Sequence, residues 1–167
     1  MPIEPRIVER AEQPYVAIRR LITMQTFDLV TDRFPEVFRW LDARGTEPVG
    51  APFLRFNVID MERELEVEAG VPVAAGADAV AAEGEILVSV LPAGRYVTAT
   101  HIGHPDELIA ATSAVLDWAA ERNLIWDASE TALGMRWGCR LLVNKTDPGQ
   151  QPDMHKWETE LLFRLAD

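Results

Sequence analysis

Carboxylates and guanidinium groups alternate along the last two candidate strands, and these side chains are the most able to do chemistry. The final strand carries Glu158 and Glu160 on one face, and the strand before it carries Arg136 and Arg140 on one face. If these strands pair, the arginines and glutamates become cross-strand neighbours. Glu160 can then hold a cation, activate a buried water molecule, or form an ion pair of little energetic value. The two arginines would instead favour an anionic ligand.

The other candidates for nucleophilic or metal chemistry are one cysteine and three histidines. A single cysteine excludes an internal disulfide and a multi-thiolate zinc site, and the apolar neighbours of Cys139 predict a buried, unreactive thiol. The spacing of His101, His104 and His155 matches no HExxH-type motif, and the sequence has no GxSxG motif. We therefore expect no metal and no cofactor. His101 is a candidate ligand residue at a strand end, and His104 is expected to cap a helix.

The composition predicts one globular domain with an acidic surface. The 167 residues include 27 acidic and 16 basic side chains, for a net charge of −11. This balance argues against direct binding to nucleic acid and to anionic lipid. No segment has the character of a signal peptide, and no apolar run is long enough to span a bilayer. We expect a cytoplasmic protein, with a homodimer left open.

Hydrophobic periodicity predicts mixed strands and helices, in two halves of the same order. The first half has a strand, a helix and two strands, at residues 14–24, 26–44, 53–60 and 64–73. The second half repeats this order, with a bent strand, a helix and two strands at residues 85–103, 105–123, 135–144 and 156–166. The alanine-rich segment 70–84 is the expected linker, as a mobile crossover or a short helix. We predict an α+β domain of two βαββ repeats, 5–73 and 85–166, that pair about a pseudo-twofold axis.

Several segments, taken in order, resemble the gyrase-inhibitor-like effector-binding domains, the ligand-sensing modules of multidrug-response transcription regulators that also occur alone. The matching segments are GVPV (70–73), LPAGRYVTATHIG (91–103), LDWAAERN (116–123), TDP (146–148) and WETELLF (157–163). They span nearly the whole chain, and their order carries more weight than any single motif. The resemblance implies a concave antiparallel sheet with two outer helices and a ligand cleft where the halves meet.

The resemblance also implies a ligand class and a set of residues. Members bind hydrophobic, often cationic aromatic compounds through aromatic side chains and a buried glutamate. Some stand-alone relatives resemble hydrolases that open cyclopropane-containing toxins with a glutamate in the same cleft. In this sequence Leu142 and Asn144 stand where the family often has that glutamate and a tyrosine, whereas Glu160 of the last strand is retained. The positions of the family's aromatic contacts correspond to Phe27 and Phe56.

We therefore expect residues 1–167 to form a single effector-binding domain that binds a small hydrophobic molecule, aromatic or cationic, in a central cleft. The alternative is a glutamate-dependent hydrolase of reactive cyclopropane-type toxins, with Glu160 as the catalytic residue. The short segment before the first strand leaves no room for a helix-turn-helix, so a regulatory role needs a separate DNA-binding protein. The candidate ligand-binding residues are Glu160, Glu158, Arg140, Leu142, Asn144, Phe27, Phe56 and His101.

Overall fold

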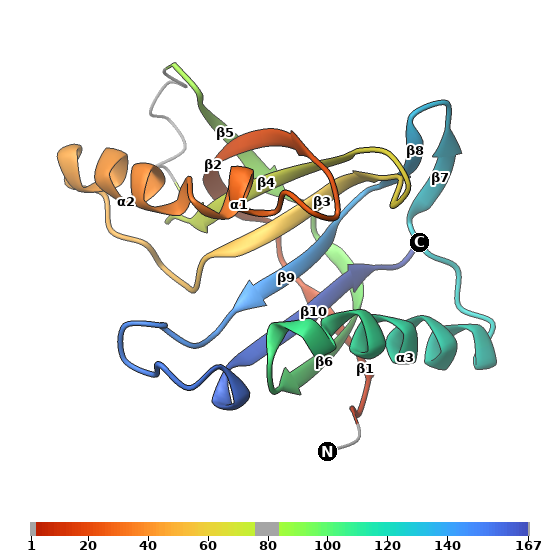
Figure 1. Cartoon of the computed structure of the whole chain (residues 1–167). Coiled ribbons are helices and arrows are strands. Elements are labelled where there is room, and N and C mark those ends of the chain that lie inside the picture. Colours follow the sequence, from red (N-terminus) through yellow and green to blue (C-terminus); the bar gives the residue numbers. More distant parts are fainter. Residues whose placement is uncertain (1–2, 76–83, 167) are drawn as a thin grey trace.

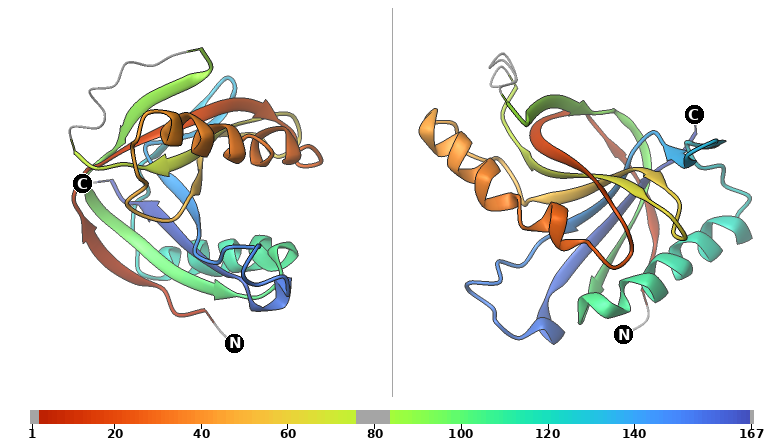
Figure 2. Two further views of the ribbon diagram at one scale, coloured as in Figure 1. Left: turned by 90° about the vertical axis from the view of Figure 1, so that its left-hand side faces the viewer. Right: turned by 45° about the horizontal axis from the view of Figure 1, so that its top comes forward.

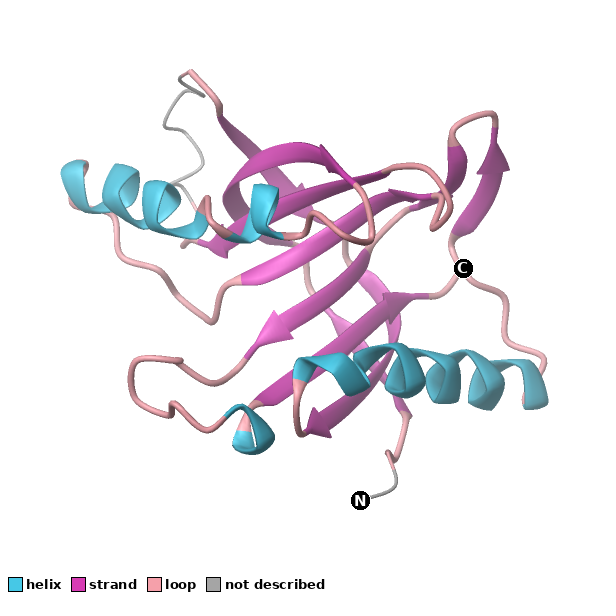
Figure 3. Cartoon of the chain, in the orientation of Figure 1, coloured by secondary structure: helices cyan, strands magenta, loops and turns pink. Residues whose placement is uncertain are grey.

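A computed structural model describes residues 3–75 and 84–166 of the chain. Its ten strands form one curled antiparallel sheet, and helices lie against one face of that sheet (Figures 1 and 3). The fold class predicted from the sequence, α+β with a curled sheet and outer helices, is confirmed. The predicted linker 70–84 falls largely on residues 76–83, which lie outside the described residues. No helix in the described part of the chain is long and apolar enough to cross a membrane.

The elements follow the predicted order. The strands are β1 (Arg6–Arg10), β2 (Gln13–Ile22), β3 (Phe53–Ile59), β4 (Leu65–Pro72), β5 (Ile86–Leu91), β6 (Gly94–Ile102), β7 (Ala128–Thr131), β8 (Gly134–Trp137), β9 (Arg140–Asn144) and β10 (Glu158–Arg164). The helices are α1 (Asp28–Thr31), α2 (Phe34–Ala43) and α3 (Leu108–Glu121), with short 3-10 turns η2 (Pro105–Glu107) and η3 (Met154–Lys156). The sequence did not predict β1 and β7.

Two predicted elements are divided in the structure. The helix expected within 26–44 is split into α1 and α2, because Pro35 stands in the first turn of α2, where its missing N–H is tolerated. The strand expected over 135–144 is split into β8 and β9 at Gly138. A side chain at Gly138 would collide with the Asp127 carboxylate, since an added Cβ would lie 1.7 Å from Oδ2 of Asp127. Because of this break, the side chains of β9 point to the opposite faces from those that continuous alternation from β8 would give them.

The sheet curls strongly because two segments of the chain bend. Strand β1 leads into β2 at one bend, and β5 leads into β6 at the other. Its strand order is β1-β6-β10-β9-β3-β4-β2-β5, with the β7–β8 hairpin attached to β3. Arg10 of β1 pairs with Gly94 of β6, and Gln13 of β2 pairs with Leu91 of β5. The pairing of segment β1–β2 with segment β5–β6 therefore continues around the bend. The sheet as a whole becomes a half-barrel (Figure 2). The pseudo-twofold relation between the halves stays a prediction.

The helices pack on the outer, convex face of the half-barrel. Helix α2 buries Val37 and Leu41 against β2 and β4. Helix α3 buries Val115 and Ala119 against β6 and β10. Figure 2 shows both helices on the same side of the sheet, so the opposite face remains free of helices. That concave face is where a ligand site has to be sought.

We predict that Phe163 is a major source of stability on the convex face. Its side chain is fully buried beside Trp126 and Trp137, with ring centroids 5.9 and 5.8 Å away. The Phe163→Ala substitution should lower the free energy of unfolding by about 3–5 kcal/mol, because it leaves a cavity in a packed cluster. Urea denaturation measures this change. The matched control Ile125→Ala, at an exposed position, should change stability by less than about 0.5 kcal/mol. Equal effects of the two substitutions would contradict the assignment.

Candidate functional site

The centre of the concave face is a cluster of buried, mostly apolar side chains. This concave cluster contains Tyr15, Ala17, Phe53, Leu91, Tyr96, Cys139, Leu141, Val143 and Leu162. Tyr15 of β2 and Tyr96 of β6 both belong to it, although four strands separate β2 from β6 in the sheet order. The face must therefore curl around these residues. The rings of Tyr15 and Phe53 meet edge to face, with their centroids 5.2 Å apart.

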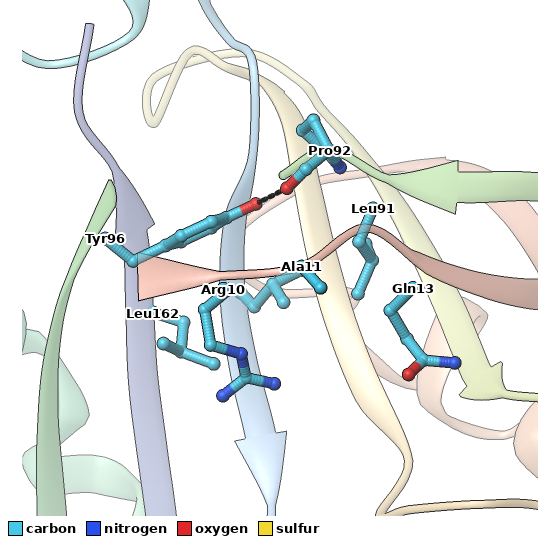
Figure 4. A pocket seen from close by; sticks show the side chains of 8 residues that line it. Arg10, Ala11, Gln13, Leu91, Pro92, Tyr96 and Leu162 are labelled. Carbon is cyan, nitrogen blue, oxygen red and sulfur yellow. Dashed lines mark hydrogen bonds between the residues drawn. The ribbon is translucent and has the colours of Figure 1, made fainter. Parts of the chain in front are cut away.

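A small pocket opens beside this cluster, at the bend where β1 passes into β2 and β5 approaches β6 (Figure 4). Its lining residues are Arg10, Ala11, Gln13, Leu91, Pro92, Tyr96, Leu141 and Leu162. The empty space is about 240 Å³, including the part open to solvent. The Tyr96 hydroxyl donates a hydrogen bond of 2.6 Å to the Pro92 carbonyl at its wall. The enclosed part of this space is only about 10 Å³, room for roughly one water molecule, whereas sites for drug-sized ligands measure roughly 300–1,000 Å³, so such a ligand needs side chains of the concave cluster to move.

Glu68 of β4 is a buried carboxylate on the concave face, only 2% exposed. Its Oε1 atom accepts a hydrogen bond of 2.5 Å from the Tyr15 hydroxyl, and its Oε2 atom accepts one of 2.5 Å from the Asn57 amide. Arg19 places Nη2 3.5 Å from Oε2. Burial of a carboxylate costs several kcal/mol unless it is paired and hydrogen-bonded. The hydrogen bonds from Tyr15 and Asn57 and the contact with Arg19 stabilise the Glu68 carboxylate at this buried position.

Arg55 of β3 is a partly buried ionisable group of the same network. Its Nη1 atom donates to the Tyr15 hydroxyl at 2.9 Å, and its Nη2 atom donates to the Gly138 carbonyl at 2.8 Å. Burial lowers the pKa of Arg55, but Tyr15, Cys139 and Glu68 raise it, and the net shift is upward. Arg55 therefore stays positively charged, next to the Tyr15–Glu68 hydrogen bond.

The two tyrosines and the cysteine of this face are neutral groups. Burial and the negative charge of Glu68 raise the pKa of Tyr15. Burial and the neighbouring Cys139 raise the pKa of Tyr96. Burial also raises the pKa of the Cys139 thiol, which fits the prediction of a buried, unreactive thiol. The hydroxyl of Tyr15 acts as a hydrogen-bond donor to Glu68 and carries no charge of its own.

Glu160, the main candidate from the sequence, also lies on the concave face. It accepts a hydrogen bond of 2.7 Å from the Thr98 hydroxyl, and its other oxygen is 3.3 Å from Nζ of Lys145. Its side chain is 16% exposed. Glu158 lies two residues earlier on the same strand and is exposed.

The predicted cross-strand pairing of Arg140 with Glu160 is wrong. The register places Glu160 opposite Val143 and Arg140 opposite Phe163. The guanidinium of Arg140 lies on the convex side, over the rings of Phe163 and Trp137, at 4.5 and 4.8 Å from their centroids. Burial there lowers the pKa of Arg140 to about 10. Uninterrupted alternation along 135–144 would put Trp137 and Cys139 on one face, but the break at Gly138 places Trp137 on the convex side and Cys139 on the concave side.

The remaining predicted ligand residues lie on the convex side. Leu142, Phe27 and Phe56 belong to the apolar cluster that packs under α1. Asn144 and His101 both lie opposite Thr159, which alternates with Glu160 along β10. Of the predicted set, the structure thus brings only the two glutamates of β10 to the concave face.

The histidines gather near the start of α3. His101 has Nε2 3.8 Å from Oε1 of Glu107, and the rings of His104 and His155 lie 5.4 Å apart. The His104 side chain accepts a hydrogen bond from the Asp106 backbone N–H, so the predicted capping role is confirmed. Within residues 3–75 and 84–166, no group of three or more His, Cys, Asp or Glu side chains is arranged to hold a metal ion.

Glu68 and Arg55 were not singled out by the sequence. In the segment ELEVEAG, strand alternation places Glu64, Glu66 and Glu68 on one face, as a solvated acidic strand would. The signal that separates Glu68 from the others is its position opposite Arg19 on one neighbouring strand and Arg55 on the other. That signal requires the register between three strands.

The comparisons with known proteins agree with this architecture. The chain belongs to the GyrI-like small molecule binding domain family, whose model matches residues 3–131. It is therefore a small-molecule-binding domain, and the resemblance seen in the sequence is confirmed. No curated protein matches the sequence.

Solved structures share the fold at low sequence identity. The C-terminal domain of EcmrR superposes with a TM-score of 0.77 at 18% identity, covering 100% of this chain and 99% of that one. EcmrR bound to DNA gives a TM-score of 0.75 at 18% identity, covering 99% of this chain; this chain spans only 58% of that one. SAV2435 bound to tetraphenylphosphonium gives a TM-score of 0.65 at 11% identity, covering 98% of this chain and 94% of that one.

We predict that neither tyrosine of the folded protein ionises near pH 10. The chain has two tyrosines, Tyr15 and Tyr96, and both have a raised pKa. Above pH 10 the unfolded chain releases these protons while the folded chain retains them. The free energy of unfolding should therefore fall with rising pH, by at most about 1.4 kcal/mol per pH unit for each tyrosine. Phenolate absorbance at 295 nm measures the ionisation of the tyrosines, and circular dichroism recorded on the same samples measures unfolding. A phenolate step at pH 10 in a protein that remains folded would contradict the burial of the network.

Proposed function

We propose that the concave face binds a small, largely apolar aromatic cation and that Glu68 supplies the opposite charge. One observation carries this proposal: the Glu68 carboxylate is 2% exposed on an aromatic face that no helix of the described chain covers. A carboxylate attracts a cation more strongly in such surroundings than in water. The rings of Tyr15, Phe53 and Tyr96 offer surfaces for aromatic stacking and cation–π contact.

The family and the charge of the chain support the same ligand class. The family binds small molecules, and SAV2435, a protein of the same fold, was solved with the aromatic cation tetraphenylphosphonium. The net charge of −11 attracts cations to the surface before they reach the cleft. In the cell the domain would act as an effector-binding or drug-sequestering protein.

The pocket at the bend is the proposed entrance to this site. Leu141 lines the pocket and lies opposite Arg55, which in turn lies opposite Glu68. The carboxylate is therefore about two strand spacings, roughly 10 Å, from the pocket wall. A ligand that pushes Leu141 and Leu162 aside would pass from the pocket toward Glu68.

Glu160 remains the second candidate for the counter-charge. It lies on the same face and near one cation, Lys145. Its greater exposure gives a ligand less electrostatic stabilisation than Glu68 offers, because solvent screens the charge. The other predicted ligand residues lie on the convex side, and the proposal makes no use of them.

The geometry favours binding over hydrolysis. A glutamate that activates water needs a free carboxylate oxygen within reach of that water. Both oxygens of Glu68 already accept hydrogen bonds, and both oxygens of Glu160 have partners in Thr98 and Lys145.

We predict that Glu68→Gln weakens tetraphenylphosphonium binding by about 10- to 150-fold, because it removes a charge-assisted contact worth roughly 1.5–3 kcal/mol. The change in affinity can be measured by isothermal titration calorimetry. Binding of neutral triphenylphosphine oxide should change by less than about threefold, which would show that the apolar face is intact. Wild-type protein should also prefer tetraphenylphosphonium over the anion tetraphenylborate.

The matched control is Glu160→Gln, a substitution of the same kind on the same face. It should change the affinity for tetraphenylphosphonium by less than about threefold, as expected for a partly solvated charge. If Glu160→Gln causes the larger loss, Glu160 is the counter-charge and the assignment to Glu68 is wrong. Tighter binding of tetraphenylborate than of tetraphenylphosphonium by the wild type would refute the cationic ligand class altogether.

A further inference from the structure

The two outer strands of the sheet, β1 and β5, differ in how they are protected against pairing with another chain. An outer strand presents a row of unpaired N–H and C=O groups, and natural proteins protect it with charged side chains, Pro or a β-bulge. Strand β1 carries the charged residues Arg6, Glu9 and Arg10. Strand β5, with the sequence ILVSVL, has no charged residue and no Pro, and its register with β2 is continuous. Strand β5 is therefore an unprotected edge, at the rim of the sheet in Figure 2.

The register shows which backbone groups of β5 point away from β2. Backbone groups alternate between the two sides of a strand, and on β2 the Pro14 carbonyl accepts a hydrogen bond from Val73, directly after β4. Tyr15, the next residue, therefore turns its backbone groups toward β5, where its partner is Ser89. Within residues 3–75 and 84–166, no strand pairs with the other side of β5. The residues whose backbone groups point to that side are Ile86, Val88 and Val90.

The side chains of β5 are apolar on both faces of the sheet. Leu87 and Leu91 pack with the concave cluster, whereas Ile86 and Val88 pack with the cluster under α2. The residues between Ile86 and Leu91 are only half-buried. A strand that is apolar on both faces is typical of the inside of a sheet, where it has a neighbour on each side. The composition of β5 thus favours a further strand beside it.

The two ends of this edge carry opposite charges. Glu85, immediately before β5, has a side chain that is 62% exposed. Beyond the other end, the Ala93 carbonyl accepts hydrogen bonds from Nε and Nη2 of Arg164 at 3.1 and 2.7 Å. Arg164 belongs to β10, which pairs with β6 on the side away from β1, so it lies on the same side as the free edge of β5. A second β5 strand that runs antiparallel would bring its own Glu85 toward Arg164.

We propose that this edge pairs with the same edge of a second copy of the chain, antiparallel and about a twofold axis beside Val88. In this register Val88 lies opposite itself and Ile86 lies opposite Val90, so the outward N–H and C=O groups of both strands find partners. Identical strands that pair in this way use the same surface twice, which gives a closed dimer. The half-buried side chains of Val88 and Val90 are then covered. This pairing is independent of the ligand that the domain binds.

Sedimentation velocity tests the pairing. A single strand pair is a small interface, so the wild type should change from monomer to dimer between about 5 and 300 µM. Val88→Lys should raise the dissociation constant at least about tenfold, because the twofold axis places two lysines opposite each other. The matched control is Ile7→Lys, the same change of charge at an exposed position of the other outer strand. It should change the dissociation constant by less than about threefold, the effect of net charge alone.

A charge-swap experiment tests the register. Val88→Glu should weaken the dimer as Val88→Lys does, since like charges again meet at the axis. An equimolar mixture of the two variants should form a mixed dimer, which native mass spectrometry detects, because Lys and Glu then lie opposite each other. Urea denaturation establishes that each variant is folded under these conditions.

Hydrogen exchange of the wild type tests the same pairing without any substitution. The amides of Ile86, Val88 and Val90 should exchange more slowly at the highest protein concentration than at the lowest, whereas those of β1 should exchange equally at both. A wild type that remains monomeric at the highest concentration refutes the pairing. A dimer that Val88→Lys and Ile7→Lys weaken equally, or that leaves the exchange of β5 unchanged, has its interface elsewhere and also refutes it. Folded variants that form no mixed dimer refute the register.

Discussion

The rest of the structure depends on one constraint: the described helices all pack on a single face of the sheet, so the other apolar face has to be buried by the sheet itself. Curling achieves this, and it brings Tyr15 of β2 and Tyr96 of β6 into one cluster from distant strands. The bends that permit the curl lie where β1 leads into β2 and β5 into β6. The pocket opens at this same point.

Curling also buries Glu68 on the concave face, and a buried charge needs partners. The register meets this need by placing Arg19, Glu68 and Arg55 opposite one another on three adjacent strands, in the order cation, anion, cation. Alternating charges attract across the sheet, whereas like charges in the same positions would repel. Tyr15 completes the set, since its hydroxyl donates to Glu68 and accepts from Arg55. The network of Arg19, Glu68, Arg55 and Tyr15 therefore forms only when β2, β4 and β3 pair in this register.

This dependence on register explains how far the sequence alone could lead. Strand alternation located β2 close to the predicted range 14–24, and helical periodicity located α2 and α3, because both patterns are local. Alternation failed at Gly138, where a close approach to Asp127 interrupts the strand and sends Arg140 to the convex side. Glu68 was indistinguishable from the other acids of its strand, since its partners come from two other strands. The family resemblance fixed the fold, but it directed attention to residues 142–144 of β9, where Leu142 and Asn144 face the helices.

Net charge and local charge have different roles in such a molecule. The excess of 11 negative charges acts over the whole surface, so it raises the concentration of any cation near the protein and distinguishes poorly between one cation and another. On strands β2, β3 and β4 of the concave face, the charges of Glu66 and Glu68 stand beside the opposite charges of Arg19 and Arg55. Under the proposed function, discrimination then comes from short-range contacts, such as the fit of a ligand's apolar body against the rings of Tyr15 and Phe53. Under the proposed function, long-range attraction brings cations to the domain, and short-range contacts at the site select among them.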